Sequence, residues 1–330
     1  MLSPLLIVTL MLVLGAEFVN GWTDAPNAIA TVVSTRVLSP GKAVLMAAVL
    51  NLVGAIATGT AVATTIGKGI VQPDIITLPV VAAAMLTILV WSGITWFYAI
   101  PSSKSHELIA GLTGAAFAAS GLNALEWSGW QKVLIGLGFS TIIGFIFGFI
   151  IMTILYWLLR KTSLGAIRSS FSRLQILSSA FMAFSHGSND GQKFMGVFAL
   201  TLLLGGKLSH FTVPIWVMVI CGTIMGIGTV IGGWRIMRTL GFRLTRLEPV
   251  NGFAAETSGS LAILIASHFG IPLSTTHCIT TSIMGVGASR RSSAVRWGMA
   301  RNIVLTWIIT FPACMLMGYL FSLGLKALGI

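Results

Sequence analysis

Charged side chains are scarce in this chain, because only 8% of its 330 residues are Asp, Glu, Lys or Arg. A soluble domain carries about 25%, so this chain cannot cover a surface that faces water, and a cytosolic enzyme is excluded. Acidic residues are especially few, since eight of them oppose 20 basic residues. The resulting net charge of +12 does not indicate a nucleic-acid partner, because such proteins need a solvated basic face.

Cysteine is also scarce, and the familiar catalytic motifs are lacking. The three cysteines, Cys221, Cys278 and Cys314, lie in apolar stretches without metal-ligand spacing, so we expect small buried hydrophobic residues. There is no H-E-x-x-H motif, no P-loop and no G-x-S-x-G motif. The sequence therefore predicts neither an enzyme nor a bound cofactor.

Apolar residues make up 55% of the chain, and its mean hydropathy is +0.94. A bilayer core about 30 Å thick is crossed by roughly 20 apolar residues in a helix. Ten segments fit this description, namely 5–35, 43–66, 78–99, 102–120, 132–159, 174–204, 213–234, 250–269, 272–288 and 297–325. We therefore expect an all-α, multi-pass protein of the cytoplasmic (inner) membrane. The two segments led by proline, 102–120 and 272–288, either span the bilayer or re-enter it.

Two of these segments are too long to be straight membrane helices. At ~1.5 Å per residue, residues 5–35 would extend well beyond the apolar core. Both long segments have glycine and polar residues at their middle, in Asn20–Asn27 and in Ser185–Lys193. Non-helical backbone inside a membrane is tolerated only within protein or beside a wet cavity. The sequence therefore predicts two helices that are broken at an internal site.

The distribution of basic residues predicts the orientation in the membrane. With the N-terminus outside and ten crossings, most basic residues fall on the inner side, which is the known bias of cytoplasmic loops. The inner set is Arg36, Lys42, Arg160, Lys161, Arg168, Arg173, Arg235, Arg238, Arg243, Arg246, Arg290, Arg291, Arg296 and Arg301. The outer set is Lys68, Lys132, Lys207 and Lys326. Both termini are then expected outside.

Two motifs occur twice along the chain. Gly21–Asn27 corresponds to Gly187–Lys193, and Ile100–His106 corresponds to Ile271–His277. The repeat divides the chain into residues 1–165 and 166–330. Five crossings in each half are an odd number, so the second half would enter the membrane from the opposite side. An inverted repeat with discontinuous helices is typical of secondary transporters, whose substrate sites lie near the membrane midplane.

The second motif has the features of a helix start that binds anions. Proline followed by Ser or Thr marks a first turn with unpaired N–H groups, and the helix dipole attracts negative charge there. Two such starts, facing each other, would suit a tetrahedral oxyanion. The hydroxyl donors are Ser103, Ser105, Ser274, Thr275 and Thr276. The alternative is that these hydroxyls bond to backbone carbonyls or hold helices together.

Acidic residues within membrane segments are rare and usually functional. Asp24 and Asp190 stand at equivalent places in the first motif, and Glu256 is a third candidate. An acid can serve an anion only with a cation or a proton between them, which implies coupling to Na⁺ or H⁺. The alternative is that each aspartate pairs with Lys104 or Lys193 to hold the core. Glu107 is a weaker candidate, because it falls near a helix end.

These motifs resemble those of the PiT family of inorganic phosphate transporters, in order and spacing, over nearly the whole chain. The resemblance is most specific at Ser185–Asp190 and Pro272–His277. It implies phosphate symport with a cation, both termini outside, and two inverted halves around one site. By matching position, the resemblance assigns to that site Asp24, Asn27, Ser103, Ser105, Asn189, Asp190, Ser274, Thr275 and Thr276.

The chain departs from the usual family pattern at a few places. The first motif reads Thr-Asp-Ala-Pro-Asn instead of Asn-Asp-Val-Ala-Asn, and its second copy ends in Lys193 where asparagine is common. Lys104 stands where a hydroxyl residue is usual. This version resembles the bacterial low-affinity branch, which is proton-coupled and carries phosphate largely as a neutral metal complex. The sequence therefore predicts phosphate:proton symport, with Lys104 and Lys193 in the coupling machinery.

Several alternatives stay open at this stage. Sodium coupling would make Asp24 and Asp190 metal ligands, and Mg²⁺ would travel with the anion if the complex is the substrate. A sulfate permease of the same family is a second alternative, since both anions are tetrahedral. A channel or membrane receptor is the alternative of another class. Beyond phosphate and the lipid bilayer, the open partners are a second copy of the chain and an acidic soluble regulator at the basic cytoplasmic surface.

Overall fold

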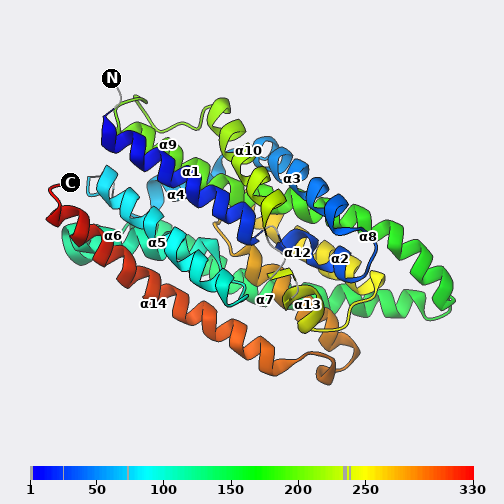
Figure 1. The fold of residues 1–330 in the computed structure, drawn as a ribbon. Coiled ribbons are helices and arrows are strands. Elements are labelled where there is room, and N and C mark those ends of the chain that lie inside the picture. Colours follow the sequence, from blue (N-terminus) through cyan, green and yellow to red (C-terminus); the bar gives the residue numbers. More distant parts are fainter. Residues whose placement is uncertain (1–2, 25, 73, 233–235, 238) are drawn as a thin grey trace.

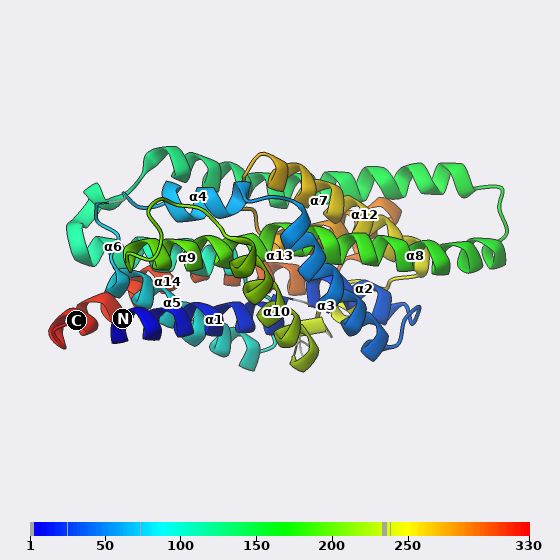
Figure 2. The ribbon, with the colours of Figure 1, turned by 90° about the horizontal axis from the view of Figure 1, so that it is seen from above.

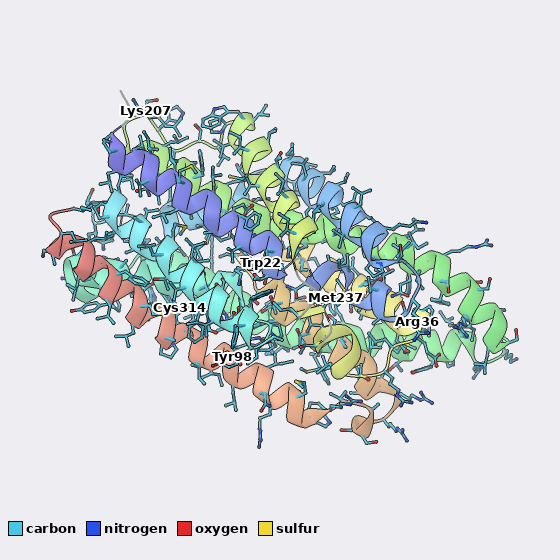
Figure 3. All side chains as sticks on the ribbon, in the orientation of Figure 1. Trp22, Arg36, Tyr98, Lys207, Met237 and Cys314 are labelled. Carbon is cyan, nitrogen blue, oxygen red and sulfur yellow. The ribbon has the colours of Figure 1, made fainter. Side chains whose placement is uncertain are left out.

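The computed structural model describes residues 3–330 apart from 25, 73, 233–235 and 238. The described chain folds into an elongated bundle of helices that run roughly along one axis (Figures 1 and 2). Both ends of the chain lie at the same end of this bundle (Figure 1). Arg36 and Lys207 lie toward opposite ends of it (Figure 3).

Among the described residues, five helical stretches are long and apolar enough to cross a membrane. They are α1 with α2 (Pro4–Asp24 and Pro26–Ser34), α3 (Pro40–Ala57), α5 (Leu78–Phe97), α7 (Trp127–Leu159) and α14 (Trp297–Ala327). On α7, the side chains of Ile142, Ile146 and Ile150 recur every four residues and are exposed. Such an apolar stripe on the outside of a bundle is suited to contact with lipid.

The other helices are shorter or more polar. They are α4 (Ala61–Gly69), α6 (Lys104–Ser120), α8 (Leu164–His186), α9 (Gln192–Leu204), α10 (Ile215–Ile231), α12 (Pro249–His268) and α13 (Thr275–Arg290). Between the helices lie two short 3-10 turns, η1 (Gly121–Ala124) and η4 (Ser292–Ala294), and two π-type turns, η2 (Gly187–Gly191) and η3 (Thr239–Arg243). Each of the ten predicted segments overlaps one or more of these helices. Arg235 and Arg238 of the predicted inner set lie outside the described residues, as does Ala25 of the first motif.

Two predictions about helix breaks are wrong. Segment 43–66 is not one helix, because α3 ends at Ala57 and α4 begins at Ala61. Gly59 between them has a φ of 81°, a conformation that glycine adopts without steric cost. Conversely, Ser185–Lys193 does not unwind: α8 continues through the π-type turn η2 into α9. A π-turn widens a helix locally without exposing its backbone to lipid.

The short helices α6 and α13 are buried at the centre of the bundle over nearly their whole length. They begin close together and extend toward opposite ends of the molecule (Figure 1). Glycines allow the lipid-facing helices to approach them closely. A Cβ at Gly144 or Gly148 of α7 would lie 2.6 or 2.4 Å from a carbonyl oxygen of α13, closer than any real contact. These glycines therefore seat α13 directly against the α7 backbone.

The buried apolar side chains form two clusters. One includes Ile29, Ala183 and Ile279, and the other includes Met85 and Phe194. Along the chain, the polar motifs separate the two clusters: Ala183 precedes the Ser185–Lys193 motif and Phe194 follows it. The charged and hydroxyl side chains of these motifs are buried, although they are polar. Because buried polar groups need partners, the contacts among them define the candidate site.

Candidate functional site

Each central helix begins at a serine that caps it. Ser103 precedes α6, and its hydroxyl oxygen accepts the backbone N–H of His106 at 3.4 Å. Ser274 precedes α13 and accepts the N–H of His277 at 3.1 Å. Serine is a favoured N-cap because its side chain satisfies one of the orphan N–H groups of the first turn. Both predicted helix starts are therefore present, and both serines serve their own helices.

The two helix starts hold each other by a reciprocal pair of hydrogen bonds. The Ser105 hydroxyl donates to the carbonyl oxygen of Leu273 at 2.7 Å, and the Thr276 hydroxyl lies 3.0 Å from the carbonyl oxygen of Ser102. Ser105 and Thr276 occupy equivalent positions in the repeated motif, as do Ser102 and Leu273. The rings of the next residues, His106 and His277, meet edge to face with centroids 4.5 Å apart. The two motifs thus face each other as matched halves.

Asp190, in the π-type turn η2, lies beside this junction with three partners. It forms a buried ion pair with Lys193, one turn along the same helical run. The Thr275 hydroxyl donates to its other oxygen at 3.0 Å, and His186 Nε2 lies 3.4 Å from that oxygen. Lys193 also donates to the carbonyl oxygen of Leu273 at 2.9 Å. The acid of the second half is therefore tied to the start of α13 by both charge and hydrogen bonds.

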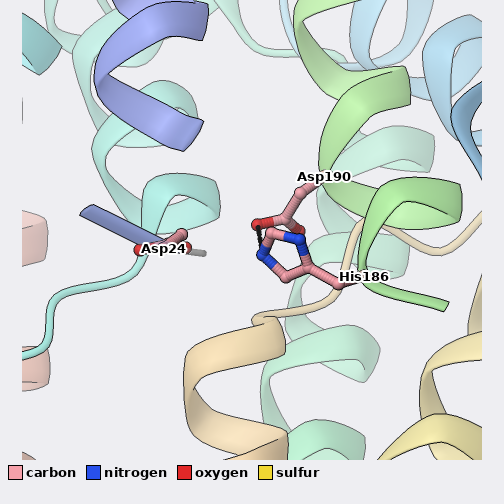
Figure 4. A group of neighbouring side chains, drawn as sticks. All are labelled: Asp24, His186 and Asp190. Atoms are coloured by element: carbon pink, nitrogen blue, oxygen red, sulfur yellow. Dashed lines mark ion pairs between the residues drawn. The ribbon is translucent and has the colours of Figure 1, made fainter. Parts of the chain in front are cut away.

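Asp24 and Asn27 approach the same junction from the first half. The Asn27 amide donates to the Thr276 hydroxyl oxygen at 2.9 Å, and that hydroxyl lies 3.3 Å from an Asp24 oxygen. Thr276 has one hydrogen to share between Asp24 and the Ser102 carbonyl. Asp24 and Asp190 thus stand on either side of the start of α13 (Figure 4).

Asp24, His186 and Asp190 form the group best placed to hold a cation. One ligand atom from each lies within 4.8 Å of the others, and all three side chains are buried (Figure 4). Two carboxylates and an imidazole offer the oxygen and nitrogen donors that cations accept in proteins. Lys193 already supplies one positive charge to this group through its ion pair with Asp190.

Lys104 lies in a second polar cluster, where its partner is Glu107. The Lys104 ammonium lies 2.9 Å from one Glu107 oxygen, which also accepts the Ser102 hydroxyl at 2.6 Å. The Ser92 hydroxyl donates to the other oxygen. The pairing of Lys104 with Asp24, one of the alternatives from the sequence, does not form. Sequence reasoning underrated Glu107, although its i,i+3 spacing from Lys104 on a helix was a usable signal.

Besides Lys104, two predicted site residues lie apart from the junction. Glu256 on α12 accepts the hydroxyls of Thr31 and Ser178 and the amide of Gln175, so it joins α2, α8 and α12. Asn189 donates to the Ser267 hydroxyl at 2.9 Å and the Ile271 carbonyl at 3.2 Å, which supports the segment before α13. The residues that the structure does bring together are Asp24, Asn27, Ser103, Ser105, Asp190, Lys193, Ser274, Thr275 and Thr276. His186, Ser102 and Leu273 belong with them.

Comparison with known proteins shows the family to which the chain belongs. The model of the family described as "Phosphate transporter family" (PHO4) matches the chain twice, at residues 20–170 and 159–318. The chain is 45% identical to a "Probable low-affinity inorganic phosphate transporter" of Rhizobium meliloti (strain 1021), over 96% of this chain and 95% of the relative. It is 43% identical to a protein of the same description from Bacillus subtilis (strain 168), over 95% of this chain and 96% of that one.

A solved structure described as "The sodium-dependent phosphate transporter" has the same fold. The two superpose with a TM-score of 0.89, and the match covers 98% of this chain and 100% of that one at 23% sequence identity. At that identity the likeness shows the fold alone. The family matches and the two bacterial relatives, by contrast, cover almost the full chain. This multi-pass membrane protein therefore belongs to the PiT (PHO4) phosphate transporter family, a family of transporters and not of enzymes.

Proposed function

We propose that this protein imports inorganic phosphate by proton-coupled symport, with the anion bound between the starts of α6 and α13. The observation that carries the proposal is the reciprocal pair of hydrogen bonds from Ser105 and Thr276. It brings two helix N-termini together in a buried setting, and each N-terminus favours negative charge. The names of the bacterial relatives support phosphate as the anion.

Phosphate would bind by taking over hydrogen bonds that the protein now makes with itself. In the described conformation, the Ser105 and Thr276 hydroxyls are engaged by carbonyl oxygens of the opposite helix start. A phosphate oxygen is a stronger acceptor than a carbonyl, because hydrogen bonds to charged groups are about twice as strong. Substrate entry would therefore separate the two helix starts. Such a change at the interface of two halves is what alternating access requires.

Lys193 supports a proton as the coupling ion. Its ammonium is a fixed point charge of the same sign as Na⁺, and it is paired with Asp190. A resident positive charge removes the need for a sodium ion at that half of the site. In the first half, the position equivalent to Lys193 is the neutral Asn27. Asp24 therefore has no lysine at that position and is the acid that would exchange a proton. Lys104 is a less direct contributor, because Glu107 neutralises it.

Sodium coupling is the second candidate. The observation that favours it is the buried group of Asp24, His186 and Asp190, in which Asp24 and Asp190 would be the sodium ligands. A divalent ion that enters with phosphate would seek the same donors. Sulfate as the substrate would use the same helix starts, since it is also tetrahedral.

The same proposal includes the architecture. Residues 1–165 and 166–330 would form two inverted halves with ten membrane segments, in which α6 and α13 are equivalent helices that start at the central site. The double family match, the reciprocal hydrogen bonds and the shared end of both termini support it. In the inner membrane both termini would face outward, by the distribution of basic residues.

Uptake of labelled phosphate into proteoliposomes tests the function. A pH gradient and a sodium gradient are imposed separately, and sulfate is added as a competitor. The proposal expects uptake driven by the pH gradient alone and little inhibition by sulfate. Uptake that collapses without sodium and ignores the pH gradient would refute proton coupling. Inhibition by sulfate at equal concentration would refute selectivity for phosphate.

A further inference from the structure

A cavity of about 420 Å³ lies far along α13 from its start at the candidate site. It is bounded by the C-terminal ends of α7 and α13 and by the segments that precede α12 and α14. Arg246, Arg290, Arg291 and Arg296 line it. Cavities that hold small ligands are typically ~300–1,000 Å³, so its volume is in the range of a binding site.

The arginines are held on a fixed frame. The Thr245 hydroxyl donates to the Ala294 carbonyl at 3.0 Å, and the Arg296 backbone N–H donates to the Leu244 carbonyl at 3.1 Å. These bonds tie the segment before α12 to the segment before α14. The four arginines thus come from two segments fastened to each other and from the last turn of α13.

The charged residues among those that line the cavity are all arginines. None of the described residues that line it is acidic. Arg246, Arg290 and Arg291 take part in none of the ion pairs formed between described residues. Arginine presents a planar fork of donors that matches phosphate oxygens in pairs. Several such forks around one cavity favour a ligand with more than one negative charge.

We infer that this arginine-lined cavity is a second anion site, which binds a phosphate-bearing anion of two or more negative charges. The ligand is a soluble oligophosphate or the phosphomonoester headgroup of a lipid. The site lies at a level suited to either source, because it has two exposed aromatic side chains nearby: Tyr156 lines the cavity, and Trp297 follows Arg296. Such residues are typical of the membrane–water interface. The inference concerns binding only and stands apart from the transport reaction.

A simpler explanation of these arginines makes a different prediction. Basic residues near a membrane surface are attracted to anionic lipids without any defined geometry, each by about 1 kcal/mol, and a basic residue in the last turn of a helix stabilises its dipole. Diffuse attraction depends only on the number of charges. Binding at a defined site depends on which arginines are changed and on the planar shape of their guanidinium groups.

The experiment measures binding of tripolyphosphate to the full-length protein in nanodiscs of phosphatidylcholine, by isothermal titration calorimetry. The test variant carries Arg246→Gln, Arg290→Gln and Arg291→Gln. We expect saturable binding to the wild type, weakened about tenfold or more in this variant, since each lost charge-assisted hydrogen bond contributes to affinity. All three side chains are exposed, so the fold should survive, which thermal unfolding checks.

Two control variants separate a site from diffuse charge. Arg160→Gln, Lys161→Gln and Arg173→Gln together remove three exposed basic residues outside the cavity, and we expect binding within about twofold of the wild type if the cavity is the site. Replacing Arg246, Arg290 and Arg291 by lysine keeps the charge but removes the guanidinium groups that bind phosphate oxygens in pairs, and we expect weaker binding. Equal losses in both glutamine variants, or full binding by the lysine variant, would overturn the inference.

The source of the ligand is tested in the same discs. Part of the phosphatidylcholine is replaced by phosphatidic acid, a phosphomonoester, or by phosphatidylglycerol, a phosphodiester. If the ligand is a lipid headgroup, phosphatidic acid should compete with tripolyphosphate and phosphatidylglycerol should not. If it is a soluble anion, neither lipid should compete. Equal competition by both lipids would show diffuse attraction and would overturn the inference.

Discussion

The hydroxyl of Thr276 lies within hydrogen-bond distance of three groups at the junction. It accepts from Asn27 and lies within reach of both the Ser102 carbonyl and Asp24. If it donates to phosphate during transport, Thr276→Ala leaves one oxygen of a desolvated anion without a partner, which costs about 1–3 kcal/mol. We expect uptake at low phosphate to fall roughly 5- to 150-fold. Uptake by the Ser105→Ala variant should fall in the same range.

Thr280→Ala is a matched control for this measurement. Thr280 is also buried on α13, one turn further along, and its hydroxyl has no hydrogen-bond partner among the described residues. Its loss should leave uptake close to the wild type. Normal uptake by both Thr276→Ala and Ser105→Ala would place phosphate elsewhere.

Lys193 is the residue that decides the coupling ion in our proposal. If its ammonium replaces sodium beside Asp190, Lys193→Asn should restore part of a sodium requirement and lower proton-driven uptake, because the resident charge is gone. If Lys193 only contacts phosphate, the apparent affinity should fall and the ion requirement should not change. Uptake under separate sodium and pH gradients distinguishes the two. Lys132→Asn, at an exposed position, is the control and should alter neither quantity.

Glu107, in the second polar cluster, is a residue whose loss should destabilise the fold. Its buried partners are Lys104, Ser102 and Ser92, and removing one member of a buried ion pair leaves an uncompensated charge that costs about 3–5 kcal/mol. We expect Glu107→Gln to lower the thermal unfolding midpoint of the detergent-solubilised protein clearly. Adding Lys104→Met removes the stranded charge and should recover part of the loss. A double variant less stable than the single one would contradict this account.

At the scale of the helices, close approach depends on glycine. A Cβ at Gly148 of α7 would lie 2.4 Å from the Ser282 carbonyl of α13, whereas a Cβ at Gly138 of the same helix meets nothing within 4 Å. Gly148→Ala should push α7 away from α13, at a cost of about 1–3 kcal/mol. Gly138→Ala should be neutral or slightly stabilising, because alanine is the better helix former. Thermal unfolding of the two variants, side by side, tests the contact, and equal midpoints would contradict it.

The same scale shows what a sequence pattern can and cannot predict about helices. Ser103 and Ser274 were predictable as helix starts, because proline and serine act through local backbone chemistry. The continuous helix through Ser185–Lys193 was not, because polar residues favour an unwound stretch only when no neighbour satisfies them. Here Thr275 at the start of α13 and Leu273 in the segment before it do so. Gly59, in the turn between α3 and α4, was a usable signal for a break in segment 43–66, which the length of the apolar segment alone does not reveal.

At the scale of the whole molecule, the repeat was the strongest source of prediction. Because the two motif pairs recur in order, the sequence indicated that Asp24, Asp190 and the two helix starts would meet, and they do. Nothing in the repeat indicated which polar group would pair with which. Lys104 pairs with Glu107, and Glu256 accepts hydrogen bonds from three donors away from the junction. The partners of Glu256 come from α2 and α8, which are distant in sequence, and periodicity does not encode such contacts. Lys104 and Glu107, by contrast, are three residues apart on one helix, and their spacing was a usable signal.

The orientation of the molecule in the membrane follows from charge and is tested directly. Basic loops stay in the cytoplasm because moving them across the membrane is unfavourable, so we expect residue 168 inside and residue 132 outside. Arg168 and Lys132 are both exposed, and the three native cysteines are buried, so single variants Arg168→Cys and Lys132→Cys give a low background. In intact cells, a membrane-impermeant maleimide should label the cysteine at 132 and not the one at 168. After the membrane is permeabilised, both should react. Labelling of residue 168 from outside intact cells would reverse the orientation, and labelling of both positions would refute the assignment of these loops to opposite sides.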